Sequence, residues 1–179
     1  SPQAKTMTDT IAIARDQILS PAGLDTGHIE RLLGQLKTSA IDAADIYFQY
    51  SRLQSWMLED GIIKDGSFNI ERGAGLRAQS GEKTGFAYAD EVQFETLLQA
   101  AKAARAIARG GGETRVKVDG AGSRLRLYDP IDPLDSLSDE DKVALQHRVD
   151  AEARRLDPRV RQVIASLVAV RDLVLIASD

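Results

Sequence analysis

Apolar side chains recur every three to four residues in four stretches of the chain, a spacing that places them on one face of a helix. This pattern predicts helices at residues 7–19, about 25–40, about 90–109 and 138–156. Three consecutive glycines end the third helix, and a proline follows the fourth. In the fourth helix we expect four apolar residues to face inward: Leu145, Val149, Ala153 and Leu156.

Between the second and third predicted helices, the period of the apolar positions changes to two. This alternation predicts a long strand at residues 44–58, followed after short turns by strands at 62–72, 73–78 and 84–89. Asp65-Gly66 interrupts the second of these strands with either a bulge or another tight turn. Strands joined by such short connections are antiparallel neighbours.

The rest of the chain adds one irregular segment and two strands. Residues 110–136 are rich in glycine and polar residues and contain one short candidate strand at 124–128. After the fourth helix, residues 160–170 and 173–177 are predicted as strands around a turn at Arg171-Asp172.

Strands therefore occur in blocks and do not alternate with helices. This order predicts an α+β fold with a largely antiparallel sheet, built from strands at about 44–89 and 160–177 and packed with about four helices. The chain has 179 residues, of which 43% are hydrophobic. That is enough for one sizeable core, so we expect a single domain over residues 1–179.

Composition narrows the classes of function. The net charge of -4 favours neither nucleic acid nor a membrane surface as a partner, and the basic stretch from Lys102 to Arg126 is interpreted as a solvated face. The absence of cysteine excludes a disulfide, a thiolate metal ligand and a cysteine nucleophile within this chain. No signal peptide opens the sequence and no apolar run approaches 18 residues. We therefore expect a soluble, cytoplasmic protein.

The stretch SGEKTGFAY at residues 80–88 is superficially similar to a phosphate-binding loop. The spacing of such a loop requires glycines at positions 77 and 82, where Arg77 and Glu82 stand. A strand follows the stretch, where a phosphate-binding loop would need a helix. We interpret it as a tight hairpin turn at Gly81-Glu82-Lys83.

Other candidate motifs also lack the spacing that their chemistry needs. Gly73-Ala74-Gly75 is no complete dinucleotide-binding motif, but glycines within a strand indicate either a bulge or an edge that admits a partner strand. His28 and His147 form no metal-binding pair. The acidic residues between 129 and 141 lack the spacing of a calcium loop and suit a loop and helix cap. No serine lies in a nucleophile motif, so we assign no catalytic, cofactor-binding or metal-binding residue.

Most of the chain is similar to the N-terminal domain of the TldD/PmbA metallopeptidase family. The match is long and specific from Tyr47 to Asp90, and it resembles the TldD branch more than the PmbA (TldE) branch. The stretches that carry the resemblance are Ile46–Gln49, Ser55–Ile70, Gly73–Ala78, Ser80–Asp90, Arg148–Asp150, Arg159-Val160 and Ala165–Leu167.

The resemblance implies a cytoplasmic two-domain protein that works with a PmbA/TldE-like subunit or as a homodimer. Family members act as zinc-dependent peptidases on unfolded or modified peptides, and older descriptions call them modulators of DNA gyrase. Their zinc site lies in the C-terminal domain, in an H-E-x-x-x-H motif with a further cysteine, and this chain has none of those residues. The resemblance thus implies zinc in the full-length protein and no cofactor in this chain.

The sequence therefore suggests a non-catalytic N-terminal domain, with the metal-binding catalytic domain absent from this chain. We expect it to shape a substrate channel and a subunit interface, and to hold an extended peptide through main-chain hydrogen bonds. The alternative is a stand-alone interaction or regulatory module of the gyrase-modulator type. Candidate peptide or interface contacts are Trp56, Asp65, Phe68, Asn69, Arg77, Phe86 and Tyr88.

Overall fold

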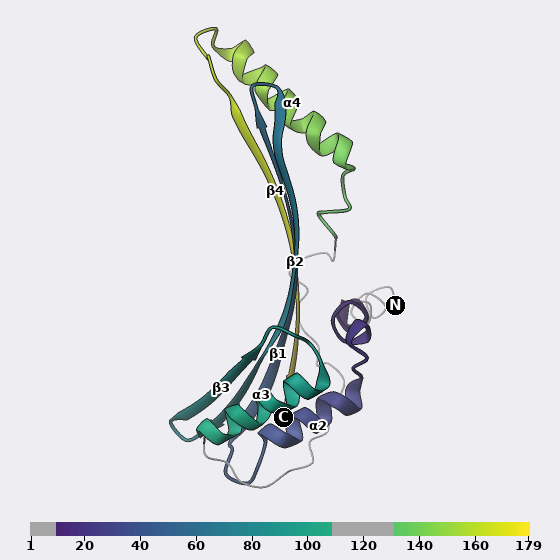
Figure 1. Ribbon diagram of the computed structural model, residues 1–179, viewed down its shortest axis with the longest axis vertical. Coiled ribbons are helices and arrows are strands. Elements are labelled where there is room, and N and C mark those ends of the chain that lie inside the picture. Colours follow the sequence, from purple (N-terminus) through teal and green to yellow (C-terminus); the bar gives the residue numbers. More distant parts are fainter. Residues whose placement is uncertain (1–9, 109–130) are drawn as a thin grey trace, which may run out of the picture. The chain divides into compact units, whose positions relative to one another are not determined.

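A computed structural model describes residues 10–108 and 131–179 of the chain (Figure 1). Within these residues the fold is α+β, with a four-stranded sheet in the order β3-β2-β1-β4. The predicted fold class is therefore confirmed, while the candidate strand at 124–128 lies outside the described residues. The strands are β1 (Ala43–Glu59), β2 (Ile62–Ser80), β3 (Lys83–Ala89) and β4 (Ile164–Ser178).

Two of the helices, α2 (Thr26–Leu36) and α4 (Asp139–Leu156), begin directly after a residue whose side chain caps them. Asp25 precedes α2, and its Oδ1 accepts the backbone N–H of His28 at 2.9 Å. Ser138 precedes α4, and its Oγ accepts the backbone N–H of Asp141 at 3.1 Å. Each cap satisfies a backbone donor that the first turn leaves free. The helical elements are η1 (Arg15–Leu19), η2 (Ser20–Ala22), α2 (Thr26–Leu36), α3 (Phe94–Ala108) and α4 (Asp139–Leu156).

The described chain divides into two compact units that share the three long strands. The first unit contains residues 10–50, 71–108 and 173–179, and the second contains residues 51–70 and 131–172. β1, β2 and β4 contribute residues to both units. α2, α3 and β3 belong to the first unit, and α4 belongs to the second.

In the first unit, α2 and α3 cover one face of the sheet (Figure 1). Buried Ile46 and Phe48 alternate with exposed Tyr47 along β1, as expected for a strand with one covered face. α3 approaches β3 closely at Gly85, where an added Cβ would overlap the backbone carbonyl of Ala104. The largest fully buried side chains of this unit are Ile18, Leu32, Leu33, Leu36, Ile46, Phe48, Leu76 and Leu97.

In the second unit, α4 contacts the sheet through polar side chains. The Lys142 side chain is only 3% exposed, and its Nζ donates to Oε1 of Gln54 at 2.8 Å. Nε2 of Gln146 donates to the carbonyl oxygens of Trp56 at 2.8 Å and Ala165 at 3.1 Å. These bonds satisfy polar groups that burial would otherwise penalise.

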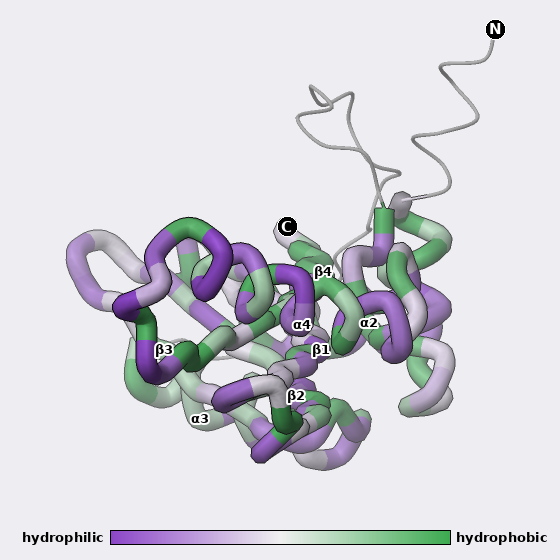
Figure 2. The backbone as a smooth tube through the Cα atoms, turned by 90° about the horizontal axis from the view of Figure 1, so that it is seen from above, coloured by the Kyte–Doolittle hydropathy of each residue, from purple (hydrophilic) through white to green (hydrophobic). Residues whose placement is uncertain are grey.

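The prediction that the apolar residues of α4 face inward is therefore wrong for two of them. Val149 is 49% exposed and Leu156 is 70% exposed. The reason lies in the sheet, because β1 offers α4 a polar side chain at Gln54 and a backbone carbonyl at Trp56, and these require polar partners. In Figure 2 most of the tube of α4 has the hydrophilic colour.

Two predicted interruptions of strands are absent from the structure. Asp65-Gly66 lies within β2, where Gly66 accommodates the Trp56 ring, whose Cε3 would lie 3.3 Å from an added Cβ. Arg171-Asp172 lies within β4, because Arg171 pairs with Asp132 and Asp172 accepts a hydrogen bond from Ser51. These side-chain interactions outweigh the turn preference of the two dipeptides.

Candidate functional site

The predicted contact residues fall into two sets, one in each unit. Arg77, Phe86 and Tyr88 belong to the first unit. The second unit holds the other four, which are Trp56, Asp65, Phe68 and Asn69.

Phe86 and Tyr88 lie on the face of the sheet that α2 and α3 leave uncovered. Their side chains are 56% and 65% exposed, whereas Gly85 and Ala89 on the opposite face of β3 are buried. The rings lie over the glycines of β2: Cβ atoms added at Gly75 and Gly73 would collide with Phe86 and Tyr88, respectively. Tyr47 is exposed on the same face, alternating with buried neighbours in β1. We call Tyr47, Phe86 and Tyr88 the aromatic face.

Arg77 extends from β2 directly opposite Phe86. Its Nε lies 2.9 Å from Oδ2 of Asp45, and its guanidinium forms an ion pair with the same carboxylate. The aromatic face is therefore accompanied by a neutralised ion pair and not by a free cation. Such a surface is suited to a protein partner and offers no chemistry for bond cleavage.

The glycines of β2 do not form an accessible edge. At Gly73–Gly75, β2 lies between β3 and β1, and Gly75 is paired with Tyr88. The prediction that a partner strand could be added here is wrong, because both sides of β2 already have neighbours. The glycines admit aromatic rings above the sheet and not another backbone beside it.

The stretch SGEKTGFAY forms the hairpin that the sequence predicts. Ser80 pairs with Lys83 across a turn in which Gly81 has a φ of 56°. The backbone N–H of Gly81 donates to Oδ2 of Asp42 at 2.6 Å. The Asp42 carboxylate therefore already accepts the hydrogen bond from the backbone N–H of Gly81, which a bound phosphate would need.

In the second unit, Trp56 packs against Gly66, and its buried indole Nε1 has no hydrogen-bond partner among residues 10–108 and 131–179. Phe68 is exposed, and the guanidinium carbon of Arg52 lies 5.9 Å from its ring centroid. Asp65 and Asn69 are also exposed. This set presents an aromatic ring among polar groups but no arrangement of acid, base and nucleophile.

A charge cluster that the sequence did not reveal holds the loop before α4 against the sheet. Asp132 accepts hydrogen bonds from Arg52 at 3.1 Å, from Arg171, and from the backbone N–H of Leu134 at 3.0 Å. Burial raises the pKa of Asp132, but the Leu134 amide and the two arginines together hold that pKa below its usual value. The cluster fixes structure and leaves no group poised for proton transfer.

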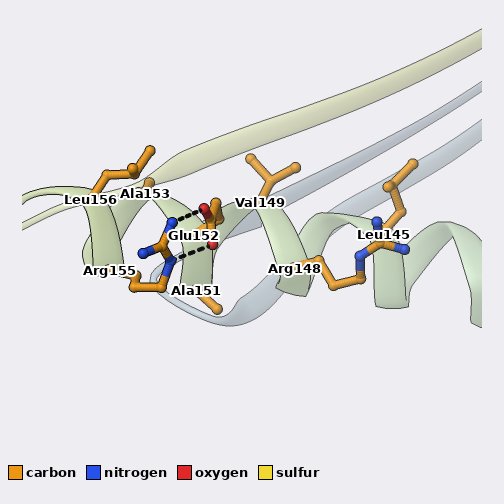
Figure 3. Close-up of a pocket in the computed structure, with 8 residues that line it drawn as sticks. All are labelled: Leu145, Arg148, Val149, Ala151, Glu152, Ala153, Arg155 and Leu156. Carbon is orange, nitrogen blue, oxygen red and sulfur yellow. Dashed lines mark hydrogen bonds and ion pairs between the residues drawn. The ribbon is translucent and has the colours of Figure 1, made fainter.

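A shallow hollow lies on the exposed surface of α4 (Figure 3). Glu152 accepts two hydrogen bonds from Arg155 within it, with Oε2 2.8 Å from Nε. The lining comes from α4 alone, and it consists of Leu145, Arg148, Val149, Ala151, Glu152, Ala153, Arg155 and Leu156.

The residues of the two units do not fit a zinc site. Within residues 10–108 and 131–179, no three His, Cys, Asp or Glu side chains come together in a way that could hold a metal ion. His28 Nδ1 lies 2.7 Å from the capping carboxylate of Asp25, and His147 belongs to the other unit. Of the described helices, none is long and apolar enough to cross a membrane.

Comparison with known proteins yields relatives that agree in both sequence and fold. Residues 44–108 match the family described as PmbA/TldA metallopeptidase domain 1. The chain is 45% identical over 161 residues to the metalloprotease TldD homolog of Haemophilus influenzae, covering 89% of this chain and 33% of that protein. It is 34% identical over 169 residues to the corresponding homolog of Buchnera aphidicola subsp. Schizaphis graminum, covering 94% of this chain and 35% of that protein. The chain thus spans about a third of the length of these relatives.

Solved structures share the fold at lower identity. A putative modulator of DNA gyrase from Bacteroides thetaiotaomicron superposes with a TM-score of 0.63 at 21% identity, over 85% of this chain and 36% of that one. TldE from Thermococcus kodakarensis superposes with a TM-score of 0.55 at 19% identity, over 83% of this chain and 34% of that one. These structures show the shared fold, and the family match and the curated relatives identify the chain as an N-terminal domain of the TldD/PmbA metallopeptidase family, in its TldD branch.

Proposed function

We propose that the chain serves as a non-catalytic domain of a TldD-like zinc metallopeptidase. The observation that carries the proposal is the 45% identity to a TldD homolog, which extends over 89% of this chain but only 33% of that protein. In this proposal the remaining two thirds of the full-length protein hold the zinc and cleave the peptide. The domain shapes access to that site and takes part in subunit assembly.

The aromatic face is our candidate for an interface with another domain or subunit. Its three rings are exposed on the sheet, and the nearby charges of Arg77 and Asp45 already neutralise each other in an ion pair. Aromatic residues are enriched and unpaired charges are depleted at the centres of protein interfaces. We propose a TldE-like subunit or a second TldD-like chain as the partner, and the cytoplasm as the location.

A hybrid protein tests this function. This chain would replace the matching third of the Haemophilus influenzae relative, and cleavage of unstructured β-casein peptides would be followed with and without zinc. We expect the hybrid to cleave in a zinc-dependent manner, and the 179-residue chain alone to neither retain zinc nor cleave. Two results would overturn the proposal: stoichiometric zinc with turnover in the chain alone, or full activity of the relative after its matching third is deleted.

A further inference from the structure

The end of β4 is fastened to the start of β1 by the side chain of Asp179. The backbone N–H of Asp179 donates to the carbonyl oxygen of Ala44 at 3.2 Å, and its Oδ1 accepts the backbone N–H of Ala44 at 2.7 Å. In an antiparallel ladder, both bonds of such a pair normally come from the main chains of the two residues. Here the carboxylate takes the place of the main-chain carbonyl, so a side chain closes the ladder between β1 and β4.

The second carboxylate oxygen of Asp179 ties the same point to α2 (Figure 1). Oδ2 lies 2.5 Å from Nζ of Lys37, the residue directly after α2. Nζ of Lys37 also donates to the carbonyl oxygen of Asp42 at 2.6 Å, and its backbone N–H donates to the carbonyl oxygen of Leu33 at 2.7 Å. One carboxylate therefore joins the end of β4 to the start of β1 and the end of α2, all within the first unit.

The ion pair between Lys37 and Asp179 is more sheltered than the one on the surface of α4. The side chains of Lys37 and Asp179 are 23% and 19% exposed, whereas those of Arg155 and Glu152 are 67% and 55% exposed. Burial raises the pKa of Asp179, but the hydrogen bonds from Lys37 and from the Ala44 amide hold that pKa below its ordinary value. The carboxylate is therefore ionised at neutral pH, and its partly buried pair is less screened by solvent than an exposed one.

An anchor at this point bears on the part of the protein that follows it in the relatives. The chain is an N-terminal domain that covers only 33% of the Haemophilus influenzae relative. In the proposed function the remaining two thirds hold the zinc, and they continue from the end of this domain. The backbone has only two soft dihedrals per residue, so holding residue 179 by both its N–H and its side chain restricts the direction of the next residue.

We propose that Asp179 is a positioning residue, which sets the direction in which the chain passes from this domain to the zinc-holding part of the full-length protein. The proposal rests on the proposed function, and Asp179 acts in it through Lys37 and Ala44, without touching substrate or metal. The anchor keeps the access that this domain shapes aligned with the zinc site. A misaligned entrance weakens the binding of a peptide but leaves the chemistry at the zinc unchanged.

The hybrid protein described above tests this role through substitutions on both sides of the pair. Asp179→Asn keeps an oxygen for the Ala44 amide but removes the charge that faces Lys37. Lys37→Met removes the opposite charge, and Lys37→Arg retains it. The matched control is Asp157→Asn after α4, because Asp157 also accepts a backbone N–H and pairs with a cation, Arg159. For each variant, kcat and KM are measured for the zinc-dependent cleavage of β-casein peptides.

We expect Asp179→Asn and Lys37→Met each to raise KM by about threefold to tenfold and to leave kcat within about twofold, because they change access and not chemistry. The double variant should be no worse than either single variant, since both remove the same interaction. Lys37→Arg and Asp157→Asn should leave KM within about twofold. A purely structural role would instead reduce the amount of active protein, which lowers the apparent kcat at constant KM.

Hydrogen exchange of the hybrid, followed by mass spectrometry, is a second readout that does not need activity. Peptides that span residue 179 and the segment after it should exchange about tenfold faster in Asp179→Asn, because an anchor of local structure is lost. The same peptides should exchange at an unchanged rate in Asp157→Asn. This measurement keeps the test decisive if the hybrid does not cleave.

Three results would overturn the proposal. These are an unchanged KM in both Asp179→Asn and Lys37→Met, a lower kcat at constant KM in these variants, or unchanged exchange beyond residue 179. The outcomes also separate this role from the proposed function. A hybrid that cleaves equally well with every substitution retains the proposed function and removes only the role of Asp179, whereas an inactive hybrid in which Asp179→Asn still accelerates exchange contradicts the proposed function alone.

Discussion

Replacing Gly85 by alanine tests whether the close approach between β3 and α3 controls the stability of the first unit. A Cβ at this position would overlap the carbonyl oxygen of Ala104. It would also lie 2.8 Å from the carbonyl carbon of Ala104 and 2.9 Å from the amide nitrogen of Ala108. Because these are backbone atoms, no side chain can rotate away. α3 must move off the sheet, or β3 must bend.

The magnitude follows from what α3 buries. One leucine and four alanines of α3 are buried, which corresponds to roughly 6 kcal/mol of transfer free energy. A gap of 0.5–1 Å across a packed surface removes about a quarter to a half of the contact energy. We therefore expect Gly85→Ala to lower the free energy of unfolding by roughly 1.5–3 kcal/mol, within the range for overpacked cores.

Gly81 supplies the control, since its φ of 56° is left-handed but an added Cβ has no neighbour within 4 Å. Gly81→Ala should cost about 1 kcal/mol for backbone strain alone. Urea unfolding followed by circular dichroism measures both changes. Extending the side chain separates the causes: Gly85→Leu should be worse than Gly85→Ala, whereas Gly81→Gln should match Gly81→Ala. Equal losses at the two positions would refute the steric explanation.

Two further predictions concern the second unit. Val149→Gln should change the free energy of unfolding by less than about 0.5 kcal/mol, whereas Gln146→Leu should lower it by about 1–3 kcal/mol, because the carbonyls of Trp56 and Ala165 lose the hydrogen bonds that the buried amide donates. Thermal melting measures both changes, and the opposite order would restore an inward-facing Val149. Because the pKa of Asp132 is lowered in the folded state from an ordinary value of 3.8, its stabilising contribution is complete above that value and disappears as pH falls through the lowered pKa. Asp132→Asn should therefore reduce the loss of stability below about pH 4 in acid titrations, and an unchanged acid profile would contradict this role.

Local patterns predicted the parts of the fold in which burial alone decides. Buried Ile46 and Phe48 alternate with exposed Tyr47 because helices cover one face of β1. The period of two among the apolar residues predicts this alternation from the sequence. Asp25 and Ser138 begin helices because each can accept a backbone hydrogen bond within one turn. The hairpin at Gly81 is local for the same reason, since a left-handed residue and short strands suffice to specify it.

The failures involve partners that are distant in the chain. Arg171-Asp172 has the composition of a turn, yet each residue is held in β4 by a partner that lies 39 positions away for Arg171 and 121 positions away for Asp172. The inward face of α4 is set by polar groups of β1, about 90 residues earlier. Hydrophobic periodicity contains no information on such partners, so it wrongly predicted that Val149 and Leu156 face inward.

The candidate site divides in the same way. The sequence identified Phe86 and Tyr88 as residues that could contact a partner, because aromatic residues in a short strand are recognisable without tertiary information. It did not identify the charge cluster around Asp132, because Arg52 and Arg171 lie 80 and 39 positions away from Asp132 in the chain.

The rings over the glycines of β2 have a consequence for how this surface can evolve. Any side chain at Gly75 collides with Phe86, and any side chain at Gly73 collides with Tyr88. A Cβ at either glycine therefore requires its ring to move, and loss of a ring would leave a bare strand that favours replacement of the glycine beneath it. Substitutions at the two members of each pair are thus epistatic and have a preferred order, with the aromatic residue changing first. The surface would be inherited as two coupled pairs and not as four independent positions.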